Sequence, residues 1–233
     1  MEAVNRSARF VGICFIVATA AGVAAVLLGS PIANAPDYLH QMAAREGVIR
    51  LEAVLIYIMS AACAGVGLGM YPILHRYGRG LAIGAAGFRL IESVTQVISG
   101  ATLIALLALS KEFVGLDSPD NALIEVLGAV IKAGDDWLTD GVMLLSWCIG
   151  AFIYYFLFFR YRLVPRWLSV WGLIGLTLTS TGSILVMLGL LSPMSALHTA
   201  SNARIALQEM VFAVWLIVRG FKFSGGNDEE SET

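Results

Sequence analysis

The chain has 233 residues, of which 58% are hydrophobic and only 14% are charged, and its mean hydropathy is +0.79. A soluble domain usually carries about 25% charged residues, so this composition indicates an integral membrane protein and excludes an ordinary soluble domain. The net charge is −2 and there is no basic patch interleaved with aromatic residues, so nucleic acid is not expected as a partner.

Six apolar segments of about 20 residues follow one another along the chain, each long enough to cross a hydrocarbon core about 30 Å thick. Their length and their Leu, Ala, Ile and Gly content predict helices rather than the short alternating strands of a barrel. The expected fold is all-α: a bundle of six transmembrane helices in one domain, 1–222, followed by a disordered acidic tail, 223–233. The expected spans are 8–28, 48–71, 81–108, 136–159, 168–191 and 202–220.

The first span has a basic start and precedes Ala33-Asn34-Ala35, a pattern typical of a signal-peptide cleavage site. Its apolar run is longer than the roughly 7 to 15 residues of a signal core, so we expect it to be retained as a membrane helix. Two shorter segments lie between spans. Residues 37–46 are predicted to form an amphipathic helix at the outer surface, and residues 122–131 are predicted to be re-entrant or interfacial.

Basic residues are concentrated on one side of this topology. Nine of the fifteen Lys and Arg residues precede span one, join spans two and three, join spans four and five, or follow span six. The positive-inside rule therefore predicts that both termini are cytoplasmic. The nine residues are Arg6, Arg9, Arg76, Arg79, Arg160, Arg162, Arg166, Arg219 and Lys222.

Charged residues also lie inside the predicted membrane core. Arg89 and Glu92 are three residues apart in the third span, so they share one helix face, and Gln96 follows one turn later. With a rise of about 1.5 Å per residue, Glu92 and Glu209 both lie roughly 15 Å from the cytoplasmic edge, near the midplane. Ionisable groups at this depth indicate a functional site by default. We therefore expect Arg89, Glu92, Gln96 and Glu209 to form an intramembrane charge cluster.

The charge balance of this cluster is uneven. Two carboxylates and one arginine leave one negative charge unpaired when all three groups are ionised, and a proton, a cation or another basic residue must neutralise it. Proton-coupled transporters use carboxylates of this kind. A purely structural role for these residues is equally consistent with the sequence. In this role, Arg89 joins the third and sixth helices through Glu209, and a protonated Glu92 only fixes their register.

A second polar group is predicted near the outer ends of the helices. This outer vestibule would contain Glu52, Asp136, Asp140, His198, Arg204 and Gln208. Capping of a helix start explains Asp135 and Asp136, whereas Asp140 lies more than one turn inside. A divalent cation held by the vestibule carboxylates and His198 is therefore an alternative. No HExxH pattern, helical His pair or Cys pair indicates zinc or haem, and the sequence names no cofactor.

Small residues predict close helix packing. Glycines in the second and third spans form seams that let helices approach closely, either within the chain or between two copies in a homodimer. They are Gly65, Gly67, Gly69, Gly80, Gly84 and Gly87. The cysteines Cys14, Cys63 and Cys148 lie in apolar runs without CxxC spacing and are predicted to be small core residues.

Several strings, distributed from end to end, are similar to one membrane-protein family. They are Asn5-Arg-Ser-Ala-Arg9, Tyr71-Pro-Ile-Leu74, Gly87-Phe-Arg-Leu-Ile-Glu92, Arg162-Leu-Val-Pro-Arg-Trp-Leu168, and Glu209 with Trp215-Leu-Ile-Val-Arg-Gly-Phe221. With these strings the chain resembles the six-helix bacterial family DUF4386, a domain of unknown function. The resemblance implies a multi-pass protein of the bacterial cytoplasmic (inner) membrane and marks Arg89, Glu92 and Glu209 as motif members. It implies no activity.

Three functions stand as hypotheses. The first is binding or transport of a small solute or ion, coupled to a proton or cation. The second is an intramembrane enzyme that acts on a lipid or isoprenoid at the outer interface through Glu52, Asp136 and Asp140. The third is an accessory subunit of a membrane complex. The lipid bilayer is the partner that composition implies directly, and a small-molecule or lipid ligand is a further expectation.

Overall fold

The computed structural model describes residues 2–115, 121–191 and 196–222, with side chains described within 6–115, 122–191 and 204–222. All regular structure in these residues is helical. The elements are α1 (Glu2–Ala33), α2 (Tyr38–Ala44), α3 (Glu46–Leu74), α4 (Arg79–Gly115), α5 (Asn121–Trp137), the π-helix η1 (Leu138–Met143), α6 (Leu144–Tyr161), α7 (Arg166–Met187) and α8 (Ala196–Val218). The predicted acidic tail, 223–233, lies outside the described residues.

Five helical segments of the described chain are long and apolar enough to cross a membrane. They are Arg6–Ala33, Glu46–Leu74, Arg79–Gly115, Ala122–Tyr161 and Arg166–Met187. The prediction of an all-α polytopic membrane protein is therefore confirmed. The helix α8 occupies most of the sixth predicted span.

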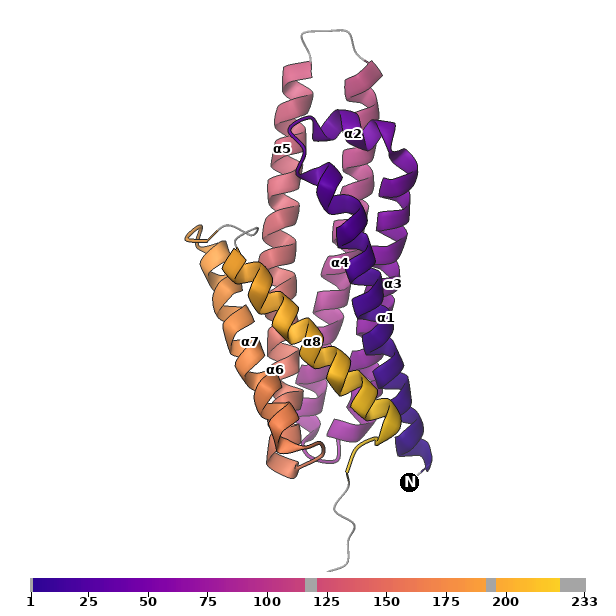
Figure 1. Ribbon diagram of the computed structural model, residues 1–233, viewed down its shortest axis with the longest axis vertical. Coiled ribbons are helices and arrows are strands. Elements are labelled where there is room, and N and C mark those ends of the chain that lie inside the picture. Colours follow the sequence, from indigo (N-terminus) through magenta and orange to yellow (C-terminus); the bar gives the residue numbers. More distant parts are fainter. Residues whose placement is uncertain (1, 116–120, 192–195, 223–233) are drawn as a thin grey trace, which may run out of the picture.

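The helices differ greatly in length. The 22 residues of α7 extend about 33 Å, close to the thickness of a hydrocarbon core, whereas the 37 residues of α4 extend about 55 Å. In Figure 1, α7 and α8 accordingly cover only the lower part of the molecule, and α4 and α5 rise above them. Because the excess length lies at one end, that end extends beyond a bilayer centred on α7.

The re-entrant alternative for residues 122–131 and the predicted helix start at Asp136 are both wrong, whereas the interfacial alternative stays a prediction. Residues 122–161 form one continuous helical run through α5, η1 and α6. The polar residues at its centre do not end the helix, because they find partners within the bundle. Ser99 Oγ donates to Asp135 Oδ2 at 3.1 Å, and Thr139 Oγ1 donates to the Asp135 carbonyl at 2.8 Å. Asp135 and Asp136 therefore lie inside a helix and cap no helix start.

The glycine seams have separate roles. Gly65 and Gly69 of α3 face Cys14 and Val11 of α1, respectively, whereas Gly67 faces α4. The α3 seam therefore serves packing within the chain, as predicted. In α4, Gly80 and Gly87 are different, because a Cβ atom at either position would meet no atom within 4 Å.

An aromatic core holds the lower half of the bundle together. Tyr154, Tyr155 and Phe158 of α6, Phe212 of α8 and Phe15 of α1 form a chain of ring contacts with centroids 4.8 to 5.8 Å apart. All five side chains are nearly fully buried. This core brings the oblique helix α8 against α1, as Figure 1 shows. These contacts also fix the position of α8 along the bundle axis, and they thereby position the polar residues of α8.

A smaller core lies under α2 at the other end. It is formed by Ile32, Met42, Ile49, Leu106 and Leu107. The predicted amphipathic helix is present as α2, which buries Leu39 and Met42 and accepts a hydrogen bond from Ser110 Oγ at the Leu39 carbonyl. Asp37 does not cap α2 with its side chain, because Asp37 Oδ1 accepts from Gln41 Nε2 at 2.9 Å. The two cores leave a polar middle layer between them.

A buried hydrogen-bonded pin joins α6, α7 and α8. Tyr155 Oη donates to Gln208 Oε1 at 2.8 Å, and Gln208 Nε2 donates to the Leu168 carbonyl at 3.2 Å. Tyr155→Phe leaves the amide oxygen without its donor, so we expect the free energy of unfolding to fall by about 1 kcal/mol. Unfolding in mixed micelles, followed by circular dichroism, measures the change. Tyr154→Phe is the matched control, since that hydroxyl is buried and has no hydrogen-bond partner among the residues that the structure describes. Equal losses in both variants would contradict the pin.

Candidate functional site

Arg89 and Glu92 form a buried ion pair on α4. Arg89 Nη1 lies 3.0 Å from Glu92 Oε2, and the side chains are only 2% and 6% exposed. The contact is not aligned as a hydrogen bond, because Arg89 Nη1 and Glu92 Oε2 both lack a hydrogen-bond partner among the described residues. The pair is therefore held by charge, and both atoms keep hydrogen-bonding capacity.

Two glycines create the space for Arg89. A Cβ atom on Gly67 of α3 would lie 2.8 Å from Arg89 Cβ, and a Cβ atom on Gly150 of α6 would lie 3.4 Å from Arg89 Cγ. The Phe15 ring of α1 closes a third side, with its centroid 5.7 Å from Arg89 Cζ, within the range of a cation–π interaction. Three helices besides α4 therefore fix the position of the guanidinium group.

Gln96 extends this polar face by one helical turn. Gln96 Nε2 donates to Glu92 Oε1 at 3.3 Å and to Cys63 Sγ of α3 at 3.7 Å. The Gln96 side chain is buried, with the residue 3% exposed, and its Oε1 has no hydrogen-bond partner in the described part of the chain. A buried amide oxygen without a partner is rare in folded proteins, so this atom is an acceptor available to a ligand.

Glu209 approaches the cluster from α8, next to α6. Trp147 Nε1 of α6 donates to Glu209 Oε1 at 3.3 Å. Arg89 and Glu209 are both described, and no ion pair joins them. The direct link between the third and sixth predicted helices through these two residues is therefore not formed. Glu209 has a neutral indole, not a guanidinium group, as its hydrogen-bond partner.

These residues line a common cavity of about 590 Å³, whose walls come from α1, α3, α4, α5, η1, α6 and α8. Such a volume is typical of small-molecule sites, which range over about 300–1,000 Å³. Its polar lining consists of Thr19, Ser30, Glu52, Arg89, Glu92, Gln96, Ser99, Asp136, Thr139, Asp140 and Glu209. Most of the remaining lining is apolar and includes Phe15, Met59, Met143, Trp147 and Ile205.

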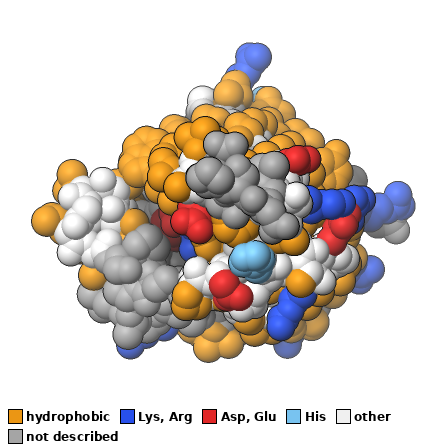
Figure 2. Space-filling model, turned by 90° about the horizontal axis from the view of Figure 1, so that it is seen from above, with side chains coloured by type: hydrophobic (Ala, Val, Ile, Leu, Met, Phe, Trp, Pro, Cys, Tyr) orange, Lys and Arg blue, Asp and Glu red, His pale blue; other side chains and the backbone are white. Residues whose placement is uncertain are grey.

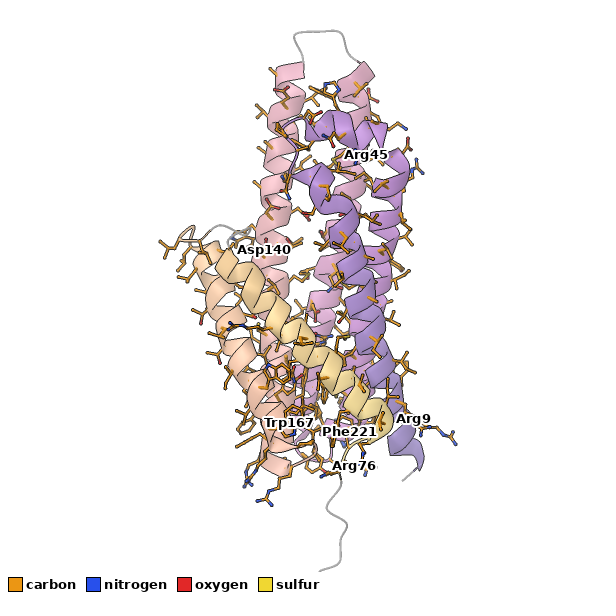
Figure 3. The ribbon with its side chains drawn as sticks, in the orientation of Figure 1. Arg9, Arg45, Arg76, Asp140, Trp167 and Phe221 are labelled. Carbon is orange, nitrogen blue, oxygen red and sulfur yellow. The ribbon has the colours of Figure 1, made fainter. Side chains whose placement is uncertain are left out.

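The cavity is accessible from the surface. It reaches the outside along α1, where the lining residues Val23 and Val26 are 51% and 63% exposed. Figure 3 places Asp140 level with the first turns of α8. The view from above in Figure 2 shows acidic side chains between two lobes of the molecule. The cavity thus has an apolar side along α1 and an acidic upper end.

Only part of the predicted outer vestibule belongs to this cavity. Glu52, Asp136 and Asp140 line it, and Glu52 packs so closely on Gly29 that a Cβ atom there would overlap its carboxylate. The other predicted members lie elsewhere or are not described. Arg204 is exposed and outside the lining, Gln208 is buried in the pin with Tyr155, and the His198 side chain lies outside the described residues.

The divalent-cation alternative has no formed site in the described part of the chain. No group of three or more His, Cys, Asp or Glu side chains there could hold a metal ion. Asp135 is also engaged with Ser99 Oγ. The acidic upper end of the cavity is therefore a set of separate carboxyl groups rather than a chelating cluster.

The π-helix η1 shapes the cavity wall opposite α1. Thr139, Asp140 and Met143 of η1 all line the cavity. A π-helix is wider than an α-helix and is found mostly as single turns at functional sites. In this chain it places a carboxyl group and a hydroxyl group in the polar layer between the two cores.

Sequence reasoning does not single out Trp147 or Phe15, although both contact the charge cluster. A signal for Trp147 exists. Asp136, Asp140, Met143 and Trp147 follow one another at spacings of four, three and four, which is typical of one helix face. Phe15 offers no such signal, since it is one apolar residue among many in the first span.

A family model described as Domain of unknown function (DUF4386) matches residues 10–220. The chain belongs to the DUF4386 family. The resemblance found in the sequence is thereby confirmed. The lining of the cavity in this DUF4386 protein runs from Phe15 to Glu209, so the cavity lies within the matched domain. No curated protein and no solved structure matches the chain.

Proposed function

We propose that this DUF4386 protein binds a small solute in the cavity and couples the binding to a proton at the charge cluster, as a proton-coupled transporter does. One observation carries the proposal: two carboxyl groups, the buried one of Glu92 and the half-buried one of Glu209, and a single guanidinium group line the inner part of the cavity. Glu92 is paired with Arg89, whereas the hydrogen-bond partner of Glu209 among the described residues is the Trp147 indole N–H. A second negative charge in this layer is not balanced within the cluster, so a proton or a cationic solute can neutralise it in exchange.

The proposal includes an orientation in the membrane. We propose six spans, with α8 as the sixth, and both termini on the cytoplasmic side of a bacterial plasma membrane. Figure 3 supports it, because Arg9 and Arg76 lie at the lower end, which also carries the arginines of the α6–α7 connection. In this orientation the Arg89 and Glu92 pair lies within the hydrocarbon layer, and the acidic upper end of the cavity faces outward.

Proton flux into proteoliposomes tests the function. The vesicles carry a pH-sensitive dye and are presented with a panel of small amines, carboxylates and sugars. We expect at least one class of solute to drive a proton flux in the wild type. Glu92→Gln and Glu209→Gln should each lower this flux by about tenfold or more, which corresponds to a free-energy difference of about 1.4 kcal/mol.

Glu112→Gln is the matched control for this flux. Glu112 lies on the same helix as Glu92 but is exposed and outside the cavity, so its variant should keep the wild-type flux. A proton flux unchanged in both Glu92→Gln and Glu209→Gln would rule out the proposed function.

A further inference from the structure

We infer that the solute of this cavity is an amphipathic cation, a molecule that carries an organic ammonium or phosphonium group on an apolar body. The inference rests on the proposed function and specifies the chemical class of its solute. Charge, hydrogen-bonding capacity, wall chemistry and access each contribute to it.

The charge of the described lining favours a cation. It holds five carboxyl groups and one guanidinium group. The guanidinium group of Arg89 lies against Glu92 and the Phe15 ring, and Gly67 and Gly150 approach the stem of the same side chain, so its charge is engaged within the chain. The carboxyl groups are distributed from the inner end to the upper end of the cavity. An anionic solute would meet them along its whole path, whereas a cation is attracted at each step.

Buried polar atoms without a hydrogen-bond partner among the described residues include donors as well as acceptors. The donors of the inner cavity are Arg89 Nε and Nη1, on a group whose charge is already paired with Glu92, and two further atoms are acceptors. Gln96 Oε1, on a side chain 3% exposed, has no hydrogen-bond partner among the described residues, and Glu92 Oε2 lacks an aligned one. Buried acceptors of this kind are costly unless a donor reaches them. An ammonium group supplies three donors and a positive charge at once, and a phosphonium group supplies the charge alone. A carboxylate or phosphate group supplies neither.

The remaining walls suit an apolar body. Trp147 presents an aromatic ring next to the Glu209 carboxyl group, an arrangement that attracts organic cations. Met59 and Met143 lie on opposing helices of the same cavity, and methionine adapts to ligands of different shape. The exposed edge at Val23 and Val26 lets a molecule already dissolved in the bilayer enter along α1.

Binding of tetraphenylphosphonium to the purified full chain in detergent tests the inference. Equilibrium dialysis of the radiolabelled cation against protein, with empty micelles as the blank, measures the affinity. Unlabelled 4-phenylbutylammonium and 5-phenylpentanoate then compete, because they share an apolar body and differ in charge. We expect the amine to displace the label and the carboxylate to leave it bound. Glu209→Gln should weaken binding about tenfold, whereas Glu112→Gln should not change it.

Displacement by 5-phenylpentanoate as strong as by the amine would overturn the inference, as would unchanged affinity in Glu209→Gln with circular dichroism that matches the wild type. The outcome is separable from the proposed function. A Glu209-dependent proton flux driven only by a carboxylate or a sugar would keep the function and reject the cation class. Charge-selective binding without any proton flux would keep the cation class and reject the coupling.

Discussion

Replacing Arg89 with methionine is expected to lower the free energy of unfolding by about 3–5 kcal/mol, the usual cost of removing one partner of a buried ion pair. The reason lies in the surroundings of Glu92. Its side chain is 6% exposed, and its carboxylate oxygen Oε2 lies 3.0 Å from Arg89 Nη1. Gln96 Nε2 also donates a hydrogen bond to this carboxylate, but the amide is neutral and does not balance the charge. Without the guanidinium group, a buried negative charge remains and must take up a proton. Unfolding in mixed micelles at neutral pH measures the loss.

A double variant shows whether the loss arises from the charge. Arg89→Met combined with Glu92→Gln removes both charges, so most of the lost stability should return. Arg45→Met is the control for removing an arginine, since Arg45 is exposed in the turn between α2 and α3. A double variant as unstable as Arg89→Met alone would show that the arginine contributes by packing rather than by its charge.

Gly67→Val is expected to cost about 3 kcal/mol through overpacking and to weaken solute binding as well. A Cβ atom at this position would already lie 2.8 Å from Arg89 Cβ and 3.3 Å from the Ala86 carbonyl oxygen. The added methyl groups must therefore separate α3 from α4 or displace Arg89 from Glu92. Thermal unfolding in detergent measures the first effect, and tetraphenylphosphonium binding measures the second.

Gly87→Val on α4 is the matched control for this change. A Cβ atom at Gly87 would meet nothing within 4 Å, so the same substitution should leave both stability and binding close to the wild type. Similar losses in the two variants would mean that valine acts through the helix backbone in general and that the close approach of α3 and α4 is not the cause.

Much of the fold could be predicted from the sequence, because membrane crossing imposes strong constraints on length and polarity. The third span, 81–108, lies inside α4, and the short amphipathic helix lies at α2. The relation of Arg89 to Glu92 follows from helical spacing alone. The prediction fails where a polar segment is taken as a helix end. Asp135 and Asp136 stay within a continuous helix because Ser99 on α4 supplies a partner, and a contact between helices leaves no trace in the local sequence.

The arrangement of the candidate site was less predictable, for the same reason. Depth counting places Glu92 and Glu209 at similar heights, but height does not fix the angle of a helix about its axis. The oblique course of α8, set by the aromatic core, leaves Glu209 next to Trp147 and turns Gln208 towards Tyr155. Gln208 and Glu209 are adjacent in the sequence, yet Glu209 lines the cavity and Gln208 belongs to the hydrogen-bonded pin.

The π-helix η1 makes this part of the cavity wall tolerant of a change in chain length. A π turn accommodates one residue more than the α-helical turn it replaces, so the flanking helices keep nearly the same phase with or without the extra residue. Loss of a single codon within Leu138–Met143 would let an ordinary α-helix run through the segment with little rotation of α5 relative to α6, and Asp136 and Trp147 would both stay at the cavity. The same loss within an ordinary α-helix of the wall, such as α4, would rotate one half of the helix by about 100° relative to the other and turn half of its polar residues away from the cavity.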